Sequence, residues 1–342
     1  MKQIAWIVDN IYIYWQDVIL VLAVAAAVCT FLALQADAEE KPFVTFPALL
    51  LAIVFSVLLS RLAQWYFRPE SYARLQMVWD LRIPGPMALL GAFFGCGLAA
   101  GVTGLVLRRA DIPGLLDRMS LTGALGIGIG RLACFFNTSD RGMVLDSSLG
   151  LPWVIATRNQ VSGAEEYRLA TFLFQSGICG LIFLILLSFY LVQKKGQNPQ
   201  RGDTALLFLM LYGASQVVLD STRYDSLYLR SNGFVSAVQV LSAFGLVLTV
   251  VVFAVRLVRA GGWKLWYGGL WLLQAGCLAV AGYMEYYVQR HGSEAVFAYG
   301  CMSLALLVLI CMAAVTRTLA RKEDEAHRAW LQQLKSIGEP EL

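Results

Sequence analysis

Nine long apolar segments constrain the fold of this chain more than any other feature. A helix needs about twenty apolar residues to cross a bilayer core of about 30 Å. The segments that meet this requirement are residues 17–36, 44–66, 84–107, 119–137, 169–192, 203–221, 233–255, 264–287 and 296–316. The fourth and sixth are the weakest, because they carry Arg131 and Asp220 near one end. Spans of this length satisfy their backbone groups as helices, so we predict an all-α, polytopic helical membrane protein.

The composition agrees with a membrane protein and excludes several other classes. The chain is 58% hydrophobic and 15% charged, whereas soluble domains are about a quarter charged. The net charge of +4 comes from 27 basic and 23 acidic residues without a concentrated basic face, which argues against nucleic acid as a partner. The seven cysteines lie in apolar runs without a C-x-x-C pattern, and the two histidines have no clustered partners. We therefore expect no metal site, disulfide scaffold or cofactor.

The distribution of basic residues predicts the orientation in the membrane. If the amino terminus lies outside, most lysines and arginines fall on one set of short connections and on the carboxyl-terminal tail, which the positive-inside rule places in the cytoplasm. The first span is followed by the small-x-small sequence Ala36-Asp37-Ala38, but its leader carries acidic Asp9 and Asp17, so we expect it to be retained. Two outer connections, 67–83 and 138–168, are long. Long connections are more often functional than idle.

The fourth span carries a glycine-rich stretch that ends in charged residues. Glycines at residues 123–130 fit close helix packing better than a nucleotide loop, because no strand precedes them. The same spacing of small residues occurs earlier, in Gly91-xxx-Gly95 and Gly97-xxx-Gly101. An arginine inside a span, here Arg131, normally faces the bundle interior or a polar cavity. Asn137, Asp140 and Arg141 follow it at the expected outer surface.

A second polar cluster ends the sixth span. A continuous helix would place Gln216, Asp220 and Arg223 on one face, at spacings of four and three residues. An Asp–Arg pair can be a plain interfacial salt bridge. Other spans also bring polar residues to their outer ends: Arg61, Arg168, Thr171, Gln239 and Ser242. A shared polar cavity that accepts an anionic lipid headgroup from the outer leaflet explains why they gather in one half of the bilayer.

In order and spacing, these motifs resemble the prolipoprotein diacylglyceryl transferase family. Residues 130–137, Gly-Arg-Leu-Ala-Cys-Phe-Phe-Asn, are similar to the family signature G-R-[IL]-[GA]-N-F-[IL]-N-G-E. The other similar motifs are Ser60-Arg61-Leu62, Arg168-Leu-Ala-Thr171, Tyr212-Gly213 with Asp220 and Arg223, and Ser236-Ala-Val-Gln239-Val-Leu-Ser242. The resemblance covers about residues 12–258. It implies a transferase-like domain of seven helices over 1–258, two additional helices over 259–316 and a charged cytoplasmic tail over 317–342.

The chain departs from the family pattern at several polar positions. Leu89 and Leu169 stand where the family has histidines, and Cys134 replaces the first asparagine of the signature. Ser139 falls at the signature glutamate, with Asp140 adjacent, and Gln216 replaces an arginine. The arginines implied to bind lipid are thus partly kept, whereas the recognised acid–base groups are largely absent.

The resemblance implies transfer of diacylglycerol from phosphatidylglycerol to the lipobox cysteine of prolipoproteins, with release of glycerol phosphate. The expected partners are phosphatidylglycerol, prolipoprotein signal peptides and membrane lipids, in a bacterial inner membrane. The implied catalytic residues are Arg131, Asp220 and Arg223, and the implied substrate-binding residues are Arg61, Asn137, Asp140, Gln216 and Gln239. Asp220 or Asp140 could accept the thiol proton. Two alternatives stay open: a catalytically impaired relative that binds anionic phospholipid or lipoprotein precursors, and a small transporter or scaffold.

Overall fold

The computed structural model describes residues 4–8, 11–72, 74–80, 85–107, 110–137, 140–145, 153–158, 163–196, 200–223, 226–229, 232–291 and 295–338. The chain divides into two compact units. The first unit contains residues 1–208 and 219–238, and the second contains residues 209–218 and 239–342.

Nine helices in the described part of the chain are long and apolar enough to cross a membrane. They are α1 (Trp15–Asp37), α2 (Pro42–Phe67), α4 (Leu89–Val106), α5 (Ile112–Leu132), α6 (Thr171–Lys195), α7 (Asp203–Ser221), α8 (Ala237–Gly261), α9 (Leu265–Arg290) and α10 (Ala295–Gly338). Three short helices are η1 (Pro69–Ser71), α3 (Gln76–Trp79) and η2 (Ala133–Phe136). The predicted all-α, polytopic membrane fold is confirmed, with one helix for each predicted span.

Helix α5 begins at Ile112, seven residues before the predicted start of the fourth span. The prediction left Asp117 and Arg118 outside the span because they are charged. In the structure both are buried, and both have partners: Arg118 pairs with Glu40, and Asp117 accepts backbone hydrogen bonds at the start of α7. Charged residues are tolerated inside a helical bundle when they are paired in this way.

Helix α10 continues without a break from the ninth span into the charged tail, ending at Gly338. The predicted boundary at residues 316–317 therefore falls inside one helix. In the second unit α10 packs along α9, and buried Gln274 donates a hydrogen bond to Thr316 Oγ1 at 3.0 Å. The division into a transferase-like domain, two added helices and a tail remains a prediction.

Small residues let the helices of the first unit approach closely. A Cβ atom on Gly91 or Gly95 of α4 would lie 2.2–2.6 Å from backbone atoms of α2, so only glycine fits there. On α5, a Cβ atom on Gly126 would meet Ala27 at 3.2 Å, and one on Gly128 would meet Cys179 at 3.4 Å. The packing interpretation is confirmed for these four glycines, whereas Gly97, Gly101 and Gly123 have open space beside them.

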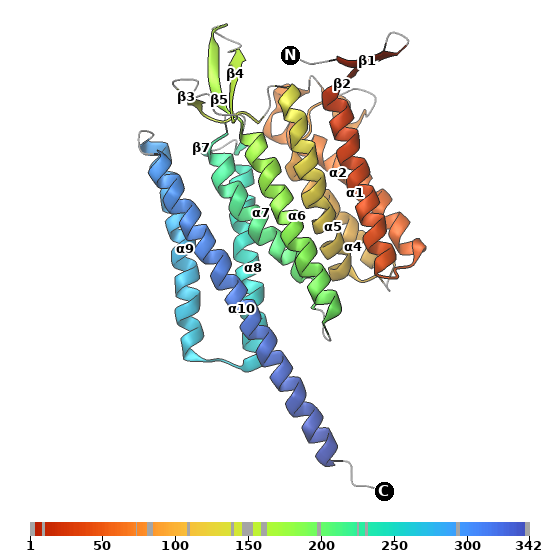
Figure 1. Cartoon of the computed structure of the whole chain (residues 1–342), viewed down its shortest axis with the longest axis vertical. Helices are drawn as coiled ribbons and strands as arrows, with labels where there is room; N and C mark the ends of the chain where they lie inside the picture. The colour runs from red at the N-terminus through yellow and green to blue at the C-terminus, as the bar shows by residue number, and fades with distance from the viewer. Residues whose placement is uncertain are drawn as a thin grey trace. The chain divides into compact units, whose positions relative to one another are not determined.

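Short strands gather at one end of the helices in the first unit, which we call the strand-bearing end (Figure 1). There β1 (Ile4–Val8) pairs with β2 (Ile11–Tyr14), and β6 (Tyr228–Leu229) pairs with β7 (Asn232–Ser236), both antiparallel. The long connection over residues 138–168 contributes β3 (Val144–Leu145), β4 (Val154–Arg158) and β5 (Glu165–Leu169) to an antiparallel sheet of order β3-β5-β4. Helix α5 ends and helix α6 begins at this end, and the predicted site residues of the first unit lie there.

Candidate functional site at the strand-bearing end

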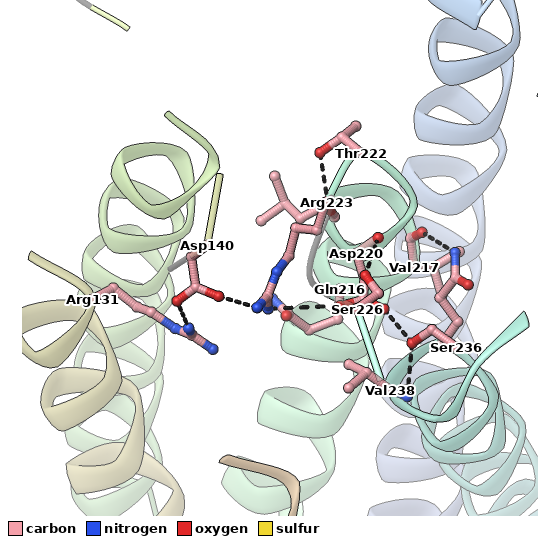
Figure 2. Close-up of polar contacts among 12 residues, drawn as sticks. Arg131, Asp140, Gln216, Val217, Asp220, Thr222, Arg223, Ser226, Ser236 and Val238 are labelled. Atoms are coloured by element: carbon pink, nitrogen blue, oxygen red, sulfur yellow. Dashed lines mark hydrogen bonds and ion pairs between the residues drawn. The ribbon is translucent and has the colours of Figure 1, made fainter. Parts of the chain in front are cut away.

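Two arginines from distant parts of the sequence share one carboxylate. Arg131 Nη1, in the last turn of α5, forms an ion pair with Asp140 Oδ2, and Arg223 Nη2 forms another with Asp140 Oδ1 (Figure 2). The Asp140 side chain is 4% exposed, whereas those of Arg131 and Arg223 are 16% and 12% exposed. The arrangement is a pair of guanidinium groups bridged by a buried anion and reached by solvent from the arginine side.

The backbone after η2 holds Asp140 in an unusual conformation. Its φ is +56°, in the left-handed region that Asp tolerates better than most residues other than Gly and Asn. Gly142 N–H donates to Leu169 O at 2.7 Å, and Leu169 N–H donates to Met143 O at 3.1 Å. These bonds fasten the Asp140 segment to the end of β5.

Gly142 lets this segment pass close to the start of α6. A Cβ atom on Gly142 would lie 2.8 Å from Thr171 Oγ1 and 2.9 Å from Leu169 Cβ. Gly142 also forms an isolated antiparallel bridge with Arg223. The backbone thus links the residues next to Asp140 directly to Arg223.

Arg223 does not lie on a helix, which corrects the prediction that it shares a helical face with Gln216 and Asp220. Helix α7 ends at Ser221, and the Arg223 N–H donates to Asp220 O at 3.2 Å in a tighter turn. The bridge with Gly142 then draws the chain out of the helix. As a result, Arg223 reaches both Asp140 and, at 3.7 Å through Nη1, Asp220 Oδ1.

Asp220 is fixed by a serine that the sequence analysis did not nominate. The Ser236 hydroxyl donates to Asp220 Oδ2, and Ser236 Oγ accepts the backbone N–H of Val238 at 3.0 Å. Ser236 directly precedes α8, so its side chain also caps that helix. The available sequence signal was its position at the start of the motif Ser236-Ala-Val-Gln239-Val-Leu-Ser242.

Cys134 and Arg141 also belong to the cluster. Cys134 Sγ is buried and donates to Asp140 Oδ2 at 3.1 Å. Arg141, a second residue that we did not nominate, donates to Asn137 O at 2.8 Å and lies over the Phe172 ring at 4.9 Å. Burial lowers the pKa of Arg141, and the electrostatic interaction with Cys134 opposes this shift. Arg141 is thus a buried cation next to Asp140 in the sequence and adds to the positive potential of this region.

The remaining predicted residues take other positions. Arg61 is 1% exposed and donates to the backbone carbonyls of Met77 at 2.8 Å and Asp80 at 3.0 Å. These contacts hold the α3 segment. Neither of them joins the group formed by Arg131, Arg223 and Asp140, which we call the two-arginine cluster. Asn137 caps η2 and is joined to the site through Arg141.

Two predicted glutamines lie in the second unit. Gln239 Nε2 donates to Val217 O at 3.3 Å, and Gln216 Nε2 donates to Ser215 Oγ at 3.4 Å. Both side chains are buried. Their predicted role in substrate binding stays a prediction.

The two histidines have aromatic neighbours in the second unit. His291 stacks on Tyr287 with ring centroids 4.5 Å apart, and His327 stacks on Trp330 at 6.1 Å. Within the described ranges, no group of three or more His, Cys, Asp or Glu residues is placed to hold a metal ion. The contacts described around Asp140 and Asp220 come from arginine, carboxylate, hydroxyl and thiol groups.

Comparison with known proteins places this cluster in a family. The sequence profile of prolipoprotein diacylglyceryl transferase matches residues 3–255. Curated relatives named phosphatidylglycerol–prolipoprotein diacylglyceryl transferase include one from Lactiplantibacillus plantarum, 28% identical over 240 residues that cover 67% of this chain and 80% of the relative. Another, from Clostridium botulinum, is 26% identical over 255 residues that cover 73% of this chain and 95% of the relative. A third, from Lactococcus lactis, is 30% identical over 220 residues, or 64% of this chain and 78% of the relative.

The matched region contains all the residues of the two-arginine cluster and ends before α9. The suspected resemblance is thereby confirmed over most of the chain, with the last two spans outside it. The chain belongs to the prolipoprotein diacylglyceryl transferase family.

Proposed function

We propose that this protein transfers the diacylglyceryl group of phosphatidylglycerol to the lipobox cysteine thiol of prolipoproteins and releases glycerol phosphate. The names of the curated relatives support this activity. The observation that carries it is the convergence of Arg131 and Arg223 on one buried anionic position. A phosphate group presents two oxygens to such a pair much as a carboxylate does.

The reaction breaks the bond between glyceryl carbon and phosphate oxygen and forms a bond between that carbon and sulfur. Electrons from the broken bond pass to the phosphate, so its negative charge grows as it leaves. We assign Arg131 and Arg223 to stabilise this charge, since donors in a partly buried site act strongly and need no reorganisation.

The thiol must lose its proton as the carbon–sulfur bond forms. We assign this proton to Asp220, whose carboxylate is held by Ser236 and faces Arg223. The nearby arginines also stabilise a thiolate, which lowers the demand on the base. Arg61, Asn137, Gln216 and Gln239 remain our proposed contacts to substrate, whereas Asp140 occupies the place on the two arginines that the phosphate takes.

The membrane setting follows from the same assignment. The protein is a multi-pass bacterial membrane protein. We propose the inner membrane, with the amino terminus outside and the carboxyl terminus in the cytoplasm. The strand-bearing end then faces outward, where signal peptides of exported prolipoproteins and lipids of the outer leaflet are available.

A second candidate function is binding of anionic phospholipid or lipoprotein precursors without catalysis. It is favoured by Leu89 and Leu169, which stand where the family has histidines. Leu89 lies at the start of α4 and Leu169 at the end of β5. Because a leucine side chain is a hydrocarbon, neither residue can accept a proton. Retention of the two arginines fits both candidates.

Purified protein in detergent, mixed with phosphatidylglycerol and a synthetic lipobox peptide, separates the two candidates. We expect the peptide to gain the mass of diacylglycerol while glycerol phosphate appears in equal amount, and both signals to be lost in Arg131→Ala. Saturable phosphatidylglycerol binding without product would favour the non-catalytic candidate. Absence of both binding and transfer would reject the two-arginine cluster as a lipid site.

A further inference from the structure

The two arginines that we assign to the lipid phosphate are already paired with a carboxylate of the protein. Asp140 uses one oxygen for Arg131 and the other for Arg223. We propose that Asp140 is an internal counter-anion, which holds the arginine pair in the resting protein and is displaced from it by the phosphate of phosphatidylglycerol. This inference rests on the proposed function and specifies how its site is regulated.

The geometry makes carboxylate and phosphate mutually exclusive partners. Both groups present two oxygens that bear negative charge to the same guanidinium nitrogens. Asp140 Oδ2 also accepts a hydrogen bond from the Cys134 thiol, so three side chains hold this carboxylate between the two arginines. A phosphate that binds the same two nitrogens, Arg131 Nη1 and Arg223 Nη2, must take the place of these oxygens.

Access and backbone conformation favour displacement over permanent pairing. Asp140 is almost fully buried, whereas the side chains of Arg131 and Arg223 are partly exposed and more accessible to an incoming anion. The left-handed backbone at Asp140 is a conformation that L residues rarely adopt. Loss of the two ion pairs would allow this segment to relax, which partly offsets their energy.

An internal counter-anion has two consequences for turnover. It keeps two like-charged side chains together and oriented while no lipid is bound, since unpaired guanidinium groups would otherwise repel each other in a partly buried site. It also competes with the product: when glycerol phosphate is formed, the tethered carboxylate is present at high effective concentration and promotes its release.

The test measures binding, separately from catalysis. Short-chain phosphatidylglycerol is titrated in a neutral detergent into wild-type protein, Asp140→Asn and Arg131→Ala. Asn tolerates the left-handed backbone and removes the competing charge, so we expect Asp140→Asn to bind phosphatidylglycerol at least tenfold more tightly. We also expect glycerol phosphate to compete with phosphatidylglycerol for this variant at a lower concentration than for wild-type protein. Diacylglycerol, which lacks phosphate, should bind the variant no better than wild type.

Glu40→Gln is the matched control. Glu40 also pairs with an arginine of α5, Arg118, at 3.0 Å, but at the opposite end of the helix. Its removal changes the net charge of the protein by the same amount and should leave phosphatidylglycerol affinity unchanged. Tighter binding in Glu40→Gln as well would mean a general charge effect and would overturn the proposal.

Weaker or equal binding of phosphatidylglycerol to Asp140→Asn would also overturn it, because Asp140 would then orient the arginines for the lipid instead of competing with it. If Asp140→Asn does not fold, Asp140→Gly replaces it, since glycine suits the same φ. Failure of the proposed function would give a different result. In that case Arg131→Ala would not change phosphatidylglycerol binding to the protein, and both proposals would be rejected.

Discussion

Helix α5 carries an arginine near each end, and the two arginines differ in their partners. At the end opposite the strands, Arg118 has Glu40 as its partner, and neighbouring Asp117 accepts the backbone N–H groups of Gly202 at 2.7 Å and Ala205 at 2.8 Å. At the strand-bearing end, Arg131 shares Asp140 with Arg223.

This difference separates a structural charge from a functional one. Arg118 and Asp117 each join elements that a bundle must hold together, α5 with the α1–α2 connection and with the start of α7. The Arg131 end instead brings two partly exposed cations to a single buried anion. Arrangements that concentrate like charges are costly for stability and typical of ligand sites.

Truncating each arginine should give the largest contrast. We expect Arg131→Ala to lower kcat/KM for transfer by about 10²–10³-fold, because one donor to the leaving phosphate is lost, with little change in Tm. Arg118→Ala should instead lower stability by about 2 kcal/mol, below the loss for a fully buried pair because Glu40 keeps some contact with water. Transfer assays on the folded fraction and thermal unfolding in detergent measure the two effects.

The contrast would break if Arg118→Ala reduced kcat/KM of folded protein as strongly as Arg131→Ala. Both ends of α5 would then contribute to the reaction.

Exchange of arginine for lysine sharpens the same comparison. Lysine keeps the charge but loses the planar fork that matches phosphate. We expect Arg131→Lys to reduce kcat/KM about tenfold, since lysine can satisfy one oxygen but not the whole geometry. Arg118→Lys should change stability by less than about 1 kcal/mol, because Arg118 meets Glu40 through one nitrogen and a point charge serves there. Equal activity losses in the two variants would argue against phosphate recognition by Arg131.

Gly142→Ala tests whether the backbone beside Asp140 sets the site. The added methyl group would collide with Thr171 and Leu169, and a shift of the segment should lower kcat/KM by about tenfold through misplacement of Asp140 and Arg223. Gly97→Ala on α4 is the control, since a Cβ atom there has no neighbour within 4 Å. Activity retained in Gly142→Ala would show that the two arginines do not depend on this close approach.

Removal of the Asp117 carboxylate should have the smallest effect on activity. Asp117→Ala leaves two N–H groups at the start of α7 without their acceptor, so we expect a stability loss of about 1–2 kcal/mol. Asp117→Asn keeps one acceptor oxygen and should lose less. Thermal unfolding measures this difference, and kcat/KM of the folded protein should not change in either variant; a specific loss of activity would contradict the structural role.

The sequence predicted the helical bundle well, because long apolar segments in a bilayer have almost no alternative to helix. It also predicted that Gly91 and Gly95 mediate packing and that Arg131 and Arg223 belong to one polar region. It placed the start of α5 too late, since a hydropathy pattern cannot show that Asp117 and Arg118 find partners. It extended α7 through Arg223, since the bridge to Gly142 is a contact between residues far apart in the chain.

The sequence by itself determined the fold class, the number of spans and the family, all of which depend on local hydrophobicity and on motifs read in order. Only the tertiary structure decided that Asp140 bridges the two arginines, that Ser236 fixes Asp220 and that Arg61 holds the backbone of the α3 segment. The physical reason is that hydrophobicity acts through each segment's own residues. Ion pairs and hydrogen bonds, in contrast, depend on which side chains from distant segments come within about 3 Å of one another.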